Sequence, residues 1–240
     1  MLQTIKKIIP NTLTSCNLIA GCIATFHAFT GNVDIALLWI VIGAAFDFFD
    51  GMSARLLHVS SPIGKELDSL ADDITFGLAP AAIVGFELTM VHYPAILMPV
   101  SDYIPFAAFV MAAFSALRLA KFNLDERQSM GFIGLPTPAN ALFWGSFILG
   151  WRDQLESSPW ALPLLLVLIL LSCYLLIAEI PMFALKFKHW GWAENQLKYI
   201  FILCCIPILL VCGVAGISLI IVWYILVSVY KNFTDKLKQQ

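Results

Sequence analysis

Long apolar stretches recur along the whole sequence, and they restrict what this chain can fold into more than any other feature. Hydrophobic residues make up 60% of the 240 positions and charged residues 12%, and the mean hydropathy is +0.85. These values are too apolar for an ordinary soluble domain. Because a bilayer offers no water to satisfy the backbone, repeated stretches of about 20 apolar residues predict membrane-spanning helices. We therefore expect an all-α polytopic membrane protein.

Eight membrane spans are expected, preceded by a short interfacial helix over residues 1–10. The spans cover residues 11–29, 34–55, 64–87, 103–122, 137–151, 159–184, 197–212 and 214–231. With the N-terminus in the cytosol, every one of the fourteen basic residues except Arg152 lies on the cytosolic side. This asymmetry predicts that both termini are cytosolic and that the number of spans is even. The expected location is the cell inner membrane.

Two neighbouring stretches place four carboxylates inside this apolar sequence, where ionisable residues usually mark a functional site. Their spacings of three and four residues put each set on a single helix face. The first set is Asp47, Asp50, Gly51, Ala54 and Arg55, and the second is Gly64, Asp68 and Asp72.

A divalent metal ion is expected between these two faces. The connection over residues 56–63 is short and contains Pro62, so the two helices can be antiparallel neighbours whose carboxylates converge. Four like charges at close range would repel one another unless a cation lay among them. Since only oxygen ligands are offered, Mg²⁺ or Mn²⁺ fits better than zinc, and Ca²⁺ also fits as a bound ion. The alternative is that these acids cap helices or form salt bridges at helix ends.

These eight positions resemble the signature of the CDP-alcohol phosphotransferase family, which has the same residue types at the same intervals. The resemblance implies that the four aspartates hold one or two divalent ions and that Asp72 is the general base. It also implies a catalytic region over residues 11–151, at the cytosolic ends of the second and third helices. The residues that it places around the cytidine diphosphate are Asp50, Gly51, Ala54, Arg55 and Gly64.

Two further segments resemble the phosphatidylserine synthase branch of this family. In the opening of the first span, Asn11 and Thr14 fit a Pro-Asn-x-x-Thr element beside the nucleotide, while helix capping near Asn11 is the alternative. The fourth span ends in an Arg-x-Ala-Lys-Phe-Asn element, and a Gly-Leu-Pro-x-Pro element begins at Gly134. The two cations of the Arg-x-Ala-Lys-Phe-Asn element can hold the end of the span at the cytosolic interface, or they can bind the carboxylate of a small acceptor. The candidates for serine binding are Arg118, Lys121 and Asn123.

The expected reaction is transfer of a phosphatidyl group from CDP-diacylglycerol to L-serine, giving phosphatidylserine and CMP. Glycerol phosphate or inositol as the acceptor is one alternative, and a cation transporter, whose acids would bind the transported ion, is another. The whole chain is read as one integral membrane domain, with additional transmembrane helices over residues 159–231 and a cytosolic tail over residues 232–240. The resemblance implies a homodimer surrounded by membrane lipid, and no nucleic-acid partner is expected.

Overall fold

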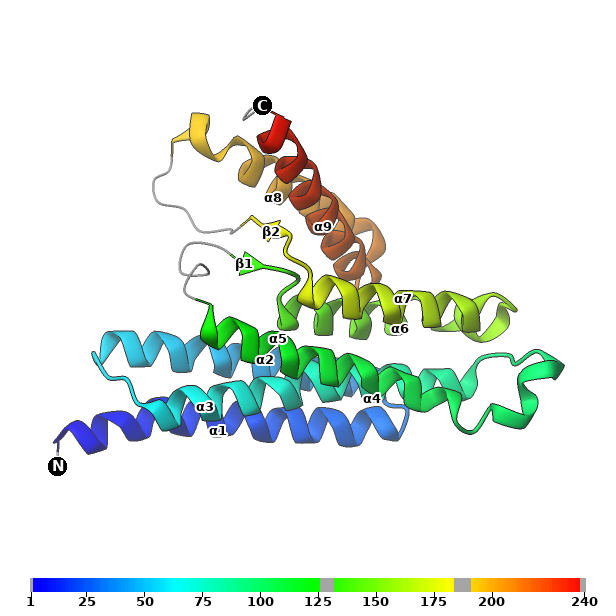
Figure 1. Cartoon of the computed structure of the whole chain (residues 1–240), viewed down its shortest axis with the longest axis horizontal. Helices are drawn as coiled ribbons and strands as arrows, with labels where there is room; N and C mark the ends of the chain where they lie inside the picture. The colour runs from blue at the N-terminus through cyan, green and yellow to red at the C-terminus, as the bar shows by residue number, and fades with distance from the viewer. Residues whose placement is uncertain (1, 126–131, 184–190, 238–240) are drawn as a thin grey trace.

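The computed structural model describes residues 2–125, 132–183 and 191–237, which are almost entirely helical (Figure 1). The first half of the chain forms α1 (Leu2–Phe29), α2 (Val33–Leu56), α3 (Pro62–Asp72), the π-helix η1 (Asp73–Leu78) and α4 (Ala79–Met90). Next come the 3₁₀ helices η2 (Ala95–Val100) and η3 (Ile104–Phe109), then α5 (Val110–Leu124) and β1 (Phe132–Ile133). The chain continues with α6 (Thr137–Ser157), α7 (Ala161–Ile177), β2 (Pro181–Met182), α8 (Trp192–Cys212) and α9 (Ala215–Leu237).

Helix α1 runs without a break from Leu2 to Phe29, with Pro10 inside it. Residues 2–10 are therefore not a separate helix but the first turns of the helix that contains the first span. The interfacial position expected for this segment stays a prediction. Membrane helices tolerate proline where neighbouring groups satisfy the freed backbone. The continuity also excludes helix capping by Asn11, because the helix starts nine residues earlier at Leu2.

A single helical stretch from Pro62 to Met90 contains the third span, with one irregular segment in the middle. This segment is η1, which begins directly after Asp72. A Cβ at Gly77 would lie 2.6 Å from Asp73 Oδ1 and 2.9 Å from Ser115 Cβ, so the glycine lets α5 approach closely. π-Helical turns often occur at functional sites, and this one adjoins the predicted base.

Six helices in the described part of the chain are long and apolar enough to cross a membrane, which agrees with a polytopic membrane fold. They cover Lys7–Phe29, Val33–Leu56, Pro62–Met90, Ile104–Leu124, Asn195–Cys212 and Ala215–Thr234. The expected spans at residues 137–151 and 159–184 correspond to α6 and to α7, a shorter apolar helix. The count of eight spans stays a prediction.

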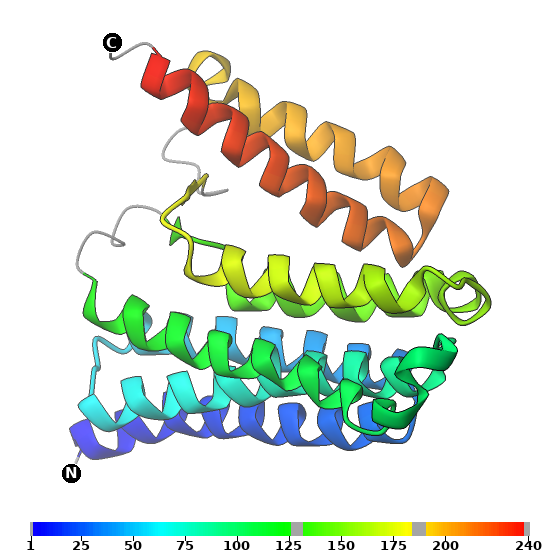
Figure 2. The same ribbon diagram turned by 45° about the vertical axis from the view of Figure 1, so that its right-hand side comes forward.

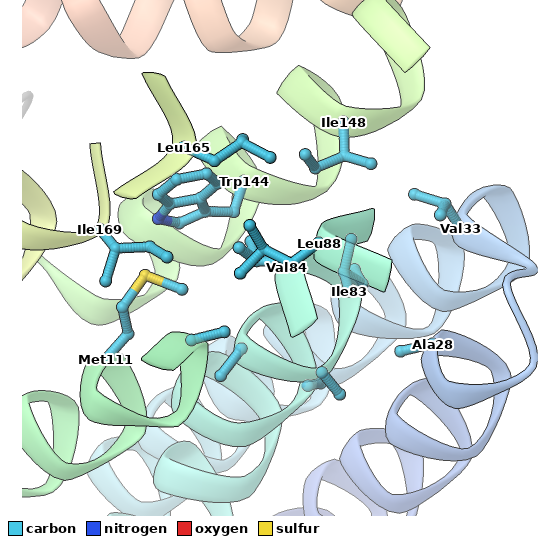
Figure 3. Close-up of a cluster of buried hydrophobic side chains, with 14 of the residues drawn as sticks. Ala28, Val33, Ile83, Val84, Leu88, Met111, Trp144, Ile148, Leu165 and Ile169 are labelled. Atoms are coloured by element: carbon cyan, nitrogen blue, oxygen red, sulfur yellow. The ribbon is translucent and has the colours of Figure 1, made fainter. Parts of the chain in front are cut away.

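The hydrophobic core lies where α4 packs between α1, α2, α6 and α5 (Figure 3). Much of α4 is buried, and its alanines and glycine allow close helix packing. Trp144 of α6 is completely buried in this core, and its Nε1 donates a 2.9 Å hydrogen bond to Ser172 Oγ of α7. The polar atom of the largest core side chain is thereby satisfied.

Helices α8 and α9 form a pair that is tilted away from the other helices (Figure 2). The pair joins the bundle mainly where α9 packs on α6 and on β2. Strand β1 pairs antiparallel with β2, Phe132 opposite Met182, which links the segments before α6 and after α7. This pairing of two residues from each segment is the one strand pairing among the described residues, and the fold otherwise agrees with the all-α prediction. The pairing forms because both segments lie at the same end of the neighbouring helices α6 and α7.

The start of α1 and the end of α9 lie at the same end of the bundle as the α2–α3 connection (Figures 1 and 2). This arrangement accords with the expectation that both termini face one side of the membrane. The side that they face stays a prediction.

Candidate active site

Three of the four predicted carboxylates converge between α2 and α3. One carboxylate oxygen from each of Asp47, Asp50 and Asp68 lies within 4.8 Å of the other two. Asp50 is 6% exposed, and the other two are partly buried. A set of closely spaced carboxylate oxygens with no nitrogen or sulfur donor fits a hard divalent cation. The spacing of acids along the two helices thus brings these three together as predicted.

A tight connection makes α2 and α3 neighbours. Helix α2 ends at Leu56, and Ser61 caps α3, its hydroxyl accepting a 2.9 Å hydrogen bond from the backbone N of Gly64. Pro62 then begins the helix with a φ angle that suits a first turn. The reversal includes His58 in the left-handed region, with φ of 52°. These features aim the acidic faces of both helices at each other.

Helix α1 supplies polar partners for two of the acids. The Thr14 hydroxyl donates a 2.6 Å hydrogen bond to Asp50 Oδ2, and Asn17 Nδ2 donates a 3.0 Å bond to Asp72 Oδ1. Asp72 lies outside the three-carboxylate group, yet its orientation is fixed by this contact. Asn17 has no assigned role in the motif, although its spacing of three from Thr14 puts both on one helix face.

A cavity of about 260 Å³ opens beside the carboxylates. Six of the residues predicted to surround the nucleotide line it: Asn11, Thr14, Asp50, Gly51, Ala54 and Gly64. It is also lined by Lys7, Pro10, Val59, Ser60, Ser61, Lys65 and Asp68.

Arg55 is the exception among the residues predicted to contact the nucleotide. It is exposed in the last turn of α2 and is not among the residues that line this cavity. One residue along a helix turns the side chain by about 100°, which separates Arg55 from the lining residue Ala54.

A second cavity, of about 400 Å³, lies on the other side of α5 toward α7. Arg118 and Lys121, two of the three serine-binding candidates, line it together with Asp125 and Glu179. The other lining residues are Leu124, Ile133, Leu176, Ile177 and Ala178. Arg118 is 6% exposed, its Nε has no hydrogen-bond partner among the described residues, and its charge interacts with Asp72. A buried guanidinium with a free donor is suited to an anionic group of a ligand.

Asn123, the third serine-binding candidate, lies between α5 and α3 instead. Its Nδ2 donates a 2.7 Å hydrogen bond to Ser69 Oγ, and its backbone oxygen accepts a 2.9 Å bond from Lys65 Nζ. It does not line the second cavity. The structure therefore gives Asn123 a role in joining helices.

Comparison with known proteins shows where this arrangement belongs. The model of the family described as CDP-alcohol phosphatidyltransferase matches residues 7–185, which include the four aspartates and every lining residue named above for the two cavities. The chain belongs to the CDP-alcohol phosphatidyltransferase family. The family match extends past α7 and ends before α8.

Curated members of the CDP-alcohol phosphatidyltransferase family resemble about half of this chain. A CDP-diacylglycerol–serine O-phosphatidyltransferase of Bacillus subtilis is 38% identical over 130 residues, which cover 54% of this chain and 69% of that protein. The protein of the same name from Helicobacter pylori strain 26695 is 38% identical over 135 residues, 55% of this chain and 54% of its own length. The one from Saccharomyces cerevisiae is 40% identical over 118 residues, 44% of this chain and 38% of its own length. The match thus spans about two thirds of the first relative and about half or less of the others.

Proposed function

We propose that this member of the family transfers a phosphatidyl group from CDP-diacylglycerol to the hydroxyl of L-serine, giving phosphatidylserine and CMP. The observation that carries the proposal is the convergence of Asp47, Asp50 and Asp68 beside a cavity that the predicted nucleotide residues line. The family match and the names of the relatives support the donor and the acceptor.

The donor set fits the divalent metal that this chemistry needs. Asp47, Asp50 and Asp68, with Asp72 beside them, would hold Mg²⁺ or Mn²⁺, because carboxylate oxygens this close together suit a hard cation. When bound, the ion neutralises charge that develops on the phosphates and on the leaving CMP.

Asp72 is the proposed general base. Asn17 holds Asp72 Oδ1 with a 3.0 Å hydrogen bond, which fixes the direction of the carboxylate. The serine hydroxyl oxygen forms a bond to the phosphorus that bears the diacylglycerol, and Asp72 accepts the hydroxyl proton. The bond from that phosphorus to the oxygen of CMP breaks, and CMP leaves through the first cavity.

The second cavity favours an amino-acid acceptor. Its lining holds cations, Arg118 and Lys121, and anions, Asp125 and Glu179. A zwitterion such as serine matches both signs: the cations would bind its carboxylate and the anions its ammonium group. Inositol carries no charge and glycerol phosphate carries only negative charge, so neither matches this lining as well. The charge of Arg118 interacts with that of Asp72, which supports an acceptor site on the side of α5 that faces the base.

The test is CMP release by the purified protein in detergent, with CDP-diacylglycerol, Mn²⁺ or Mg²⁺, and serine, inositol or glycerol phosphate. We expect release with serine alone and a loss of about 10²–10⁴-fold in Asp72→Asn. Asp102→Asn, which alters an exposed acid at the other end of the bundle, is the matched control and should keep full activity. Release with another acceptor would replace serine in the proposal. No release with any acceptor would overturn it.

A further inference from the structure

Two lysines share the first cavity with the acidic residues. The lining includes Lys7 of α1 and Lys65 of α3 as well as Asp50 and Asp68. Arg55, the cation that the family resemblance assigns to the nucleotide, is not part of this lining. The cavity therefore has an acidic wall suited to a metal and two cations suited to an anionic group.

Hydrogen bonds between α3 and α5 restrain the side chain of Lys65, one of the residues that line this cavity. Its Nζ donates a 2.9 Å hydrogen bond to the backbone oxygen of Asn123. Asn123 Nδ2 donates to Ser69 Oγ at 2.7 Å, and the Ser69 hydroxyl donates to the backbone oxygen of Lys65 at 3.3 Å. These three hydrogen bonds form a closed loop, here called the Lys65 clasp. A free lysine side chain samples many rotamers, so the clasp limits the entropy that Lys65 loses when it binds a ligand.

The clasp leaves Lys65 able to bind an anion. An ammonium group has three N–H donors, and the partner in the clasp is a neutral carbonyl, so the positive charge is not neutralised there. A phosphate oxygen at the cavity could accept a further hydrogen bond while the clasp stays closed. Charge-assisted bonds of this kind are about twice as strong as neutral ones.

We propose that Lys65, together with Lys7 of the same cavity, binds the diphosphate of the nucleotide-linked lipid, and that Asn123 and Ser69 are positioning residues for Lys65. The inference rests on the proposed function, since it names how the donor is held in that site. The same phosphate chemistry is present on the headgroup of a neighbouring anionic lipid, and the experiment separates these two sources.

The test measures binding of CDP to the purified protein in uncharged detergent with Mn²⁺, by titration calorimetry. Lys65→Met should raise the Kd for CDP about 10-fold or more, because a charge-assisted hydrogen bond is lost. Lys65→Arg should restore most of the affinity for CDP. Lys7→Met should raise the Kd for CDP less than Lys65→Met does. Lys231→Met, at an exposed lysine of α9, is the matched control and should leave the Kd unchanged. An unchanged Kd in Lys65→Met would overturn the proposal.

The positioning role has a separate readout. Ser69→Ala opens the clasp without removing a charge, so it should raise KM for the CDP-lipid several-fold while kcat and the KM for the acceptor stay unchanged. A fall in kcat with unchanged KM for the CDP-lipid would contradict a positioning role. Adding phosphatidylglycerol to the detergent distinguishes the phosphate sources. If Lys65→Met changes only the response to this lipid, Lys65 binds a headgroup and the proposal is wrong.

Two comparisons keep the inference separate from folding and from the proposed function. The melting temperature and the Mn²⁺ affinity of Lys65→Met should equal those of the unmodified protein. If Lys65→Met does not fold, the Kd of Lys65→Arg for CDP is compared with that of the unmodified protein instead. CDP binding needs no acceptor. A protein that binds CDP through Lys65 but releases no CMP with serine would refute the proposed function alone.

Discussion

Asn17 of α1 donates a 3.0 Å hydrogen bond from Nδ2 to Oδ1 of Asp72, the last residue of α3. The backbone oxygen of Asn17 accepts a 3.0 Å bond from the hydroxyl of Thr75 in η1. Asn17 is completely buried, so both contacts lie away from competing water. A helix that carries none of the four aspartates thus sets the direction of the proposed base.

Asn17→Ala should lower kcat about 10- to 100-fold, because the Asp72 carboxylate loses the contact that orients it. The KM for the CDP-lipid should change much less, since the first cavity keeps its lining. Steady-state CMP release measures both constants. Asn32→Ala, at an exposed asparagine between α1 and α2, should retain the kcat of the unmodified protein. Equal kcat in Asn17→Ala would show that Asp72 needs no such support.

Thr14→Val should weaken metal binding about 10-fold or more while preserving the shape of the side chain. The change removes the 2.6 Å hydrogen bond to Asp50 Oδ2, and partners of metal ligands typically contribute this much to affinity. The Mn²⁺ concentration for half-maximal activity is the measurement, and Thr14→Ser should restore it. Thr25→Val, whose hydroxyl bonds to the backbone of Gly21 in the same helix, is the control. If Thr14→Val and Thr25→Val raised the Mn²⁺ concentration for half-maximal activity equally, the effect would come from loss of any hydroxyl in α1 and not from the bond to Asp50.

Alanine substitutions at two glycines of α2, Gly43 and Gly51, should have different effects on the stability of the protein. A Cβ at Gly43 would lie 2.6 Å from Thr75 Cγ2 and 2.9 Å from Asn17 Oδ1, so Gly43→Ala should destabilise the protein by roughly 1–3 kcal/mol through overpacking. Among the described residues, no atom outside the adjoining backbone of α2 lies within 4 Å of a Cβ at Gly51. Gly51→Ala should therefore keep the melting temperature or raise it, because alanine favours the helix.

The effect of Gly51→Ala should instead be on substrate binding. The new methyl group would project into the first cavity, which Gly51 lines, and should raise KM for the CDP-lipid. Thermal unfolding followed by tryptophan fluorescence, together with CMP release, separates the two effects. The prediction would be wrong if Gly51→Ala lowered the melting temperature and left KM for the CDP-lipid unchanged, because the space around Gly51 should accept a methyl group without strain.

Glu87 and Arg152 form an ion pair at the end of the bundle opposite the α2–α3 connection. Arg152 Nε lies 3.6 Å from Glu87 Oε2, and Glu87 is completely buried. Arg152 also contacts Glu156 at 2.9 Å, and its Nη1 donates a 3.0 Å bond to the backbone oxygen of Gly31. Arg152→Met should destabilise the protein by about 3–5 kcal/mol, since it leaves a buried carboxylate without its partner.

The double variant Arg152→Met with Glu87→Gln should regain part of the lost stability, because it also removes the buried charge. Thermal unfolding of the double variant and of each single variant, Arg152→Met and Glu87→Gln, in one detergent tests this coupling. Activity per folded molecule should stay normal, because the pair is far from both proposed substrate cavities along the helices. Additive losses in the double variant would mean that Arg152 acts through Gly31 and Glu156 rather than through Glu87.

Local spacing was enough to predict the membrane class, most helix positions and the convergence of Asp47, Asp50 and Asp68. Hydrophobic stretches and i, i+3, i+4 patterns are properties of one helix, and they follow from backbone geometry alone. The same reasoning assigned Arg118 and Lys121 to one face, and both line the second cavity. The family signature added the identity of the chemistry.

Contacts between helices could be decided only by the tertiary structure. Packing of α1 against α2 and α3 brought Thr14 to Asp50 and Asn17 to Asp72, over separations of 36 and 55 residues. It also left Arg55 outside the first cavity while Lys65 lines it. The sequence fixes which residues share a helix face, whereas the position of that face depends on how all the helices fill space together. For that reason the hydrogen-bond partners of the aspartates, Thr14 and Asn17, could be identified only from the packed structure.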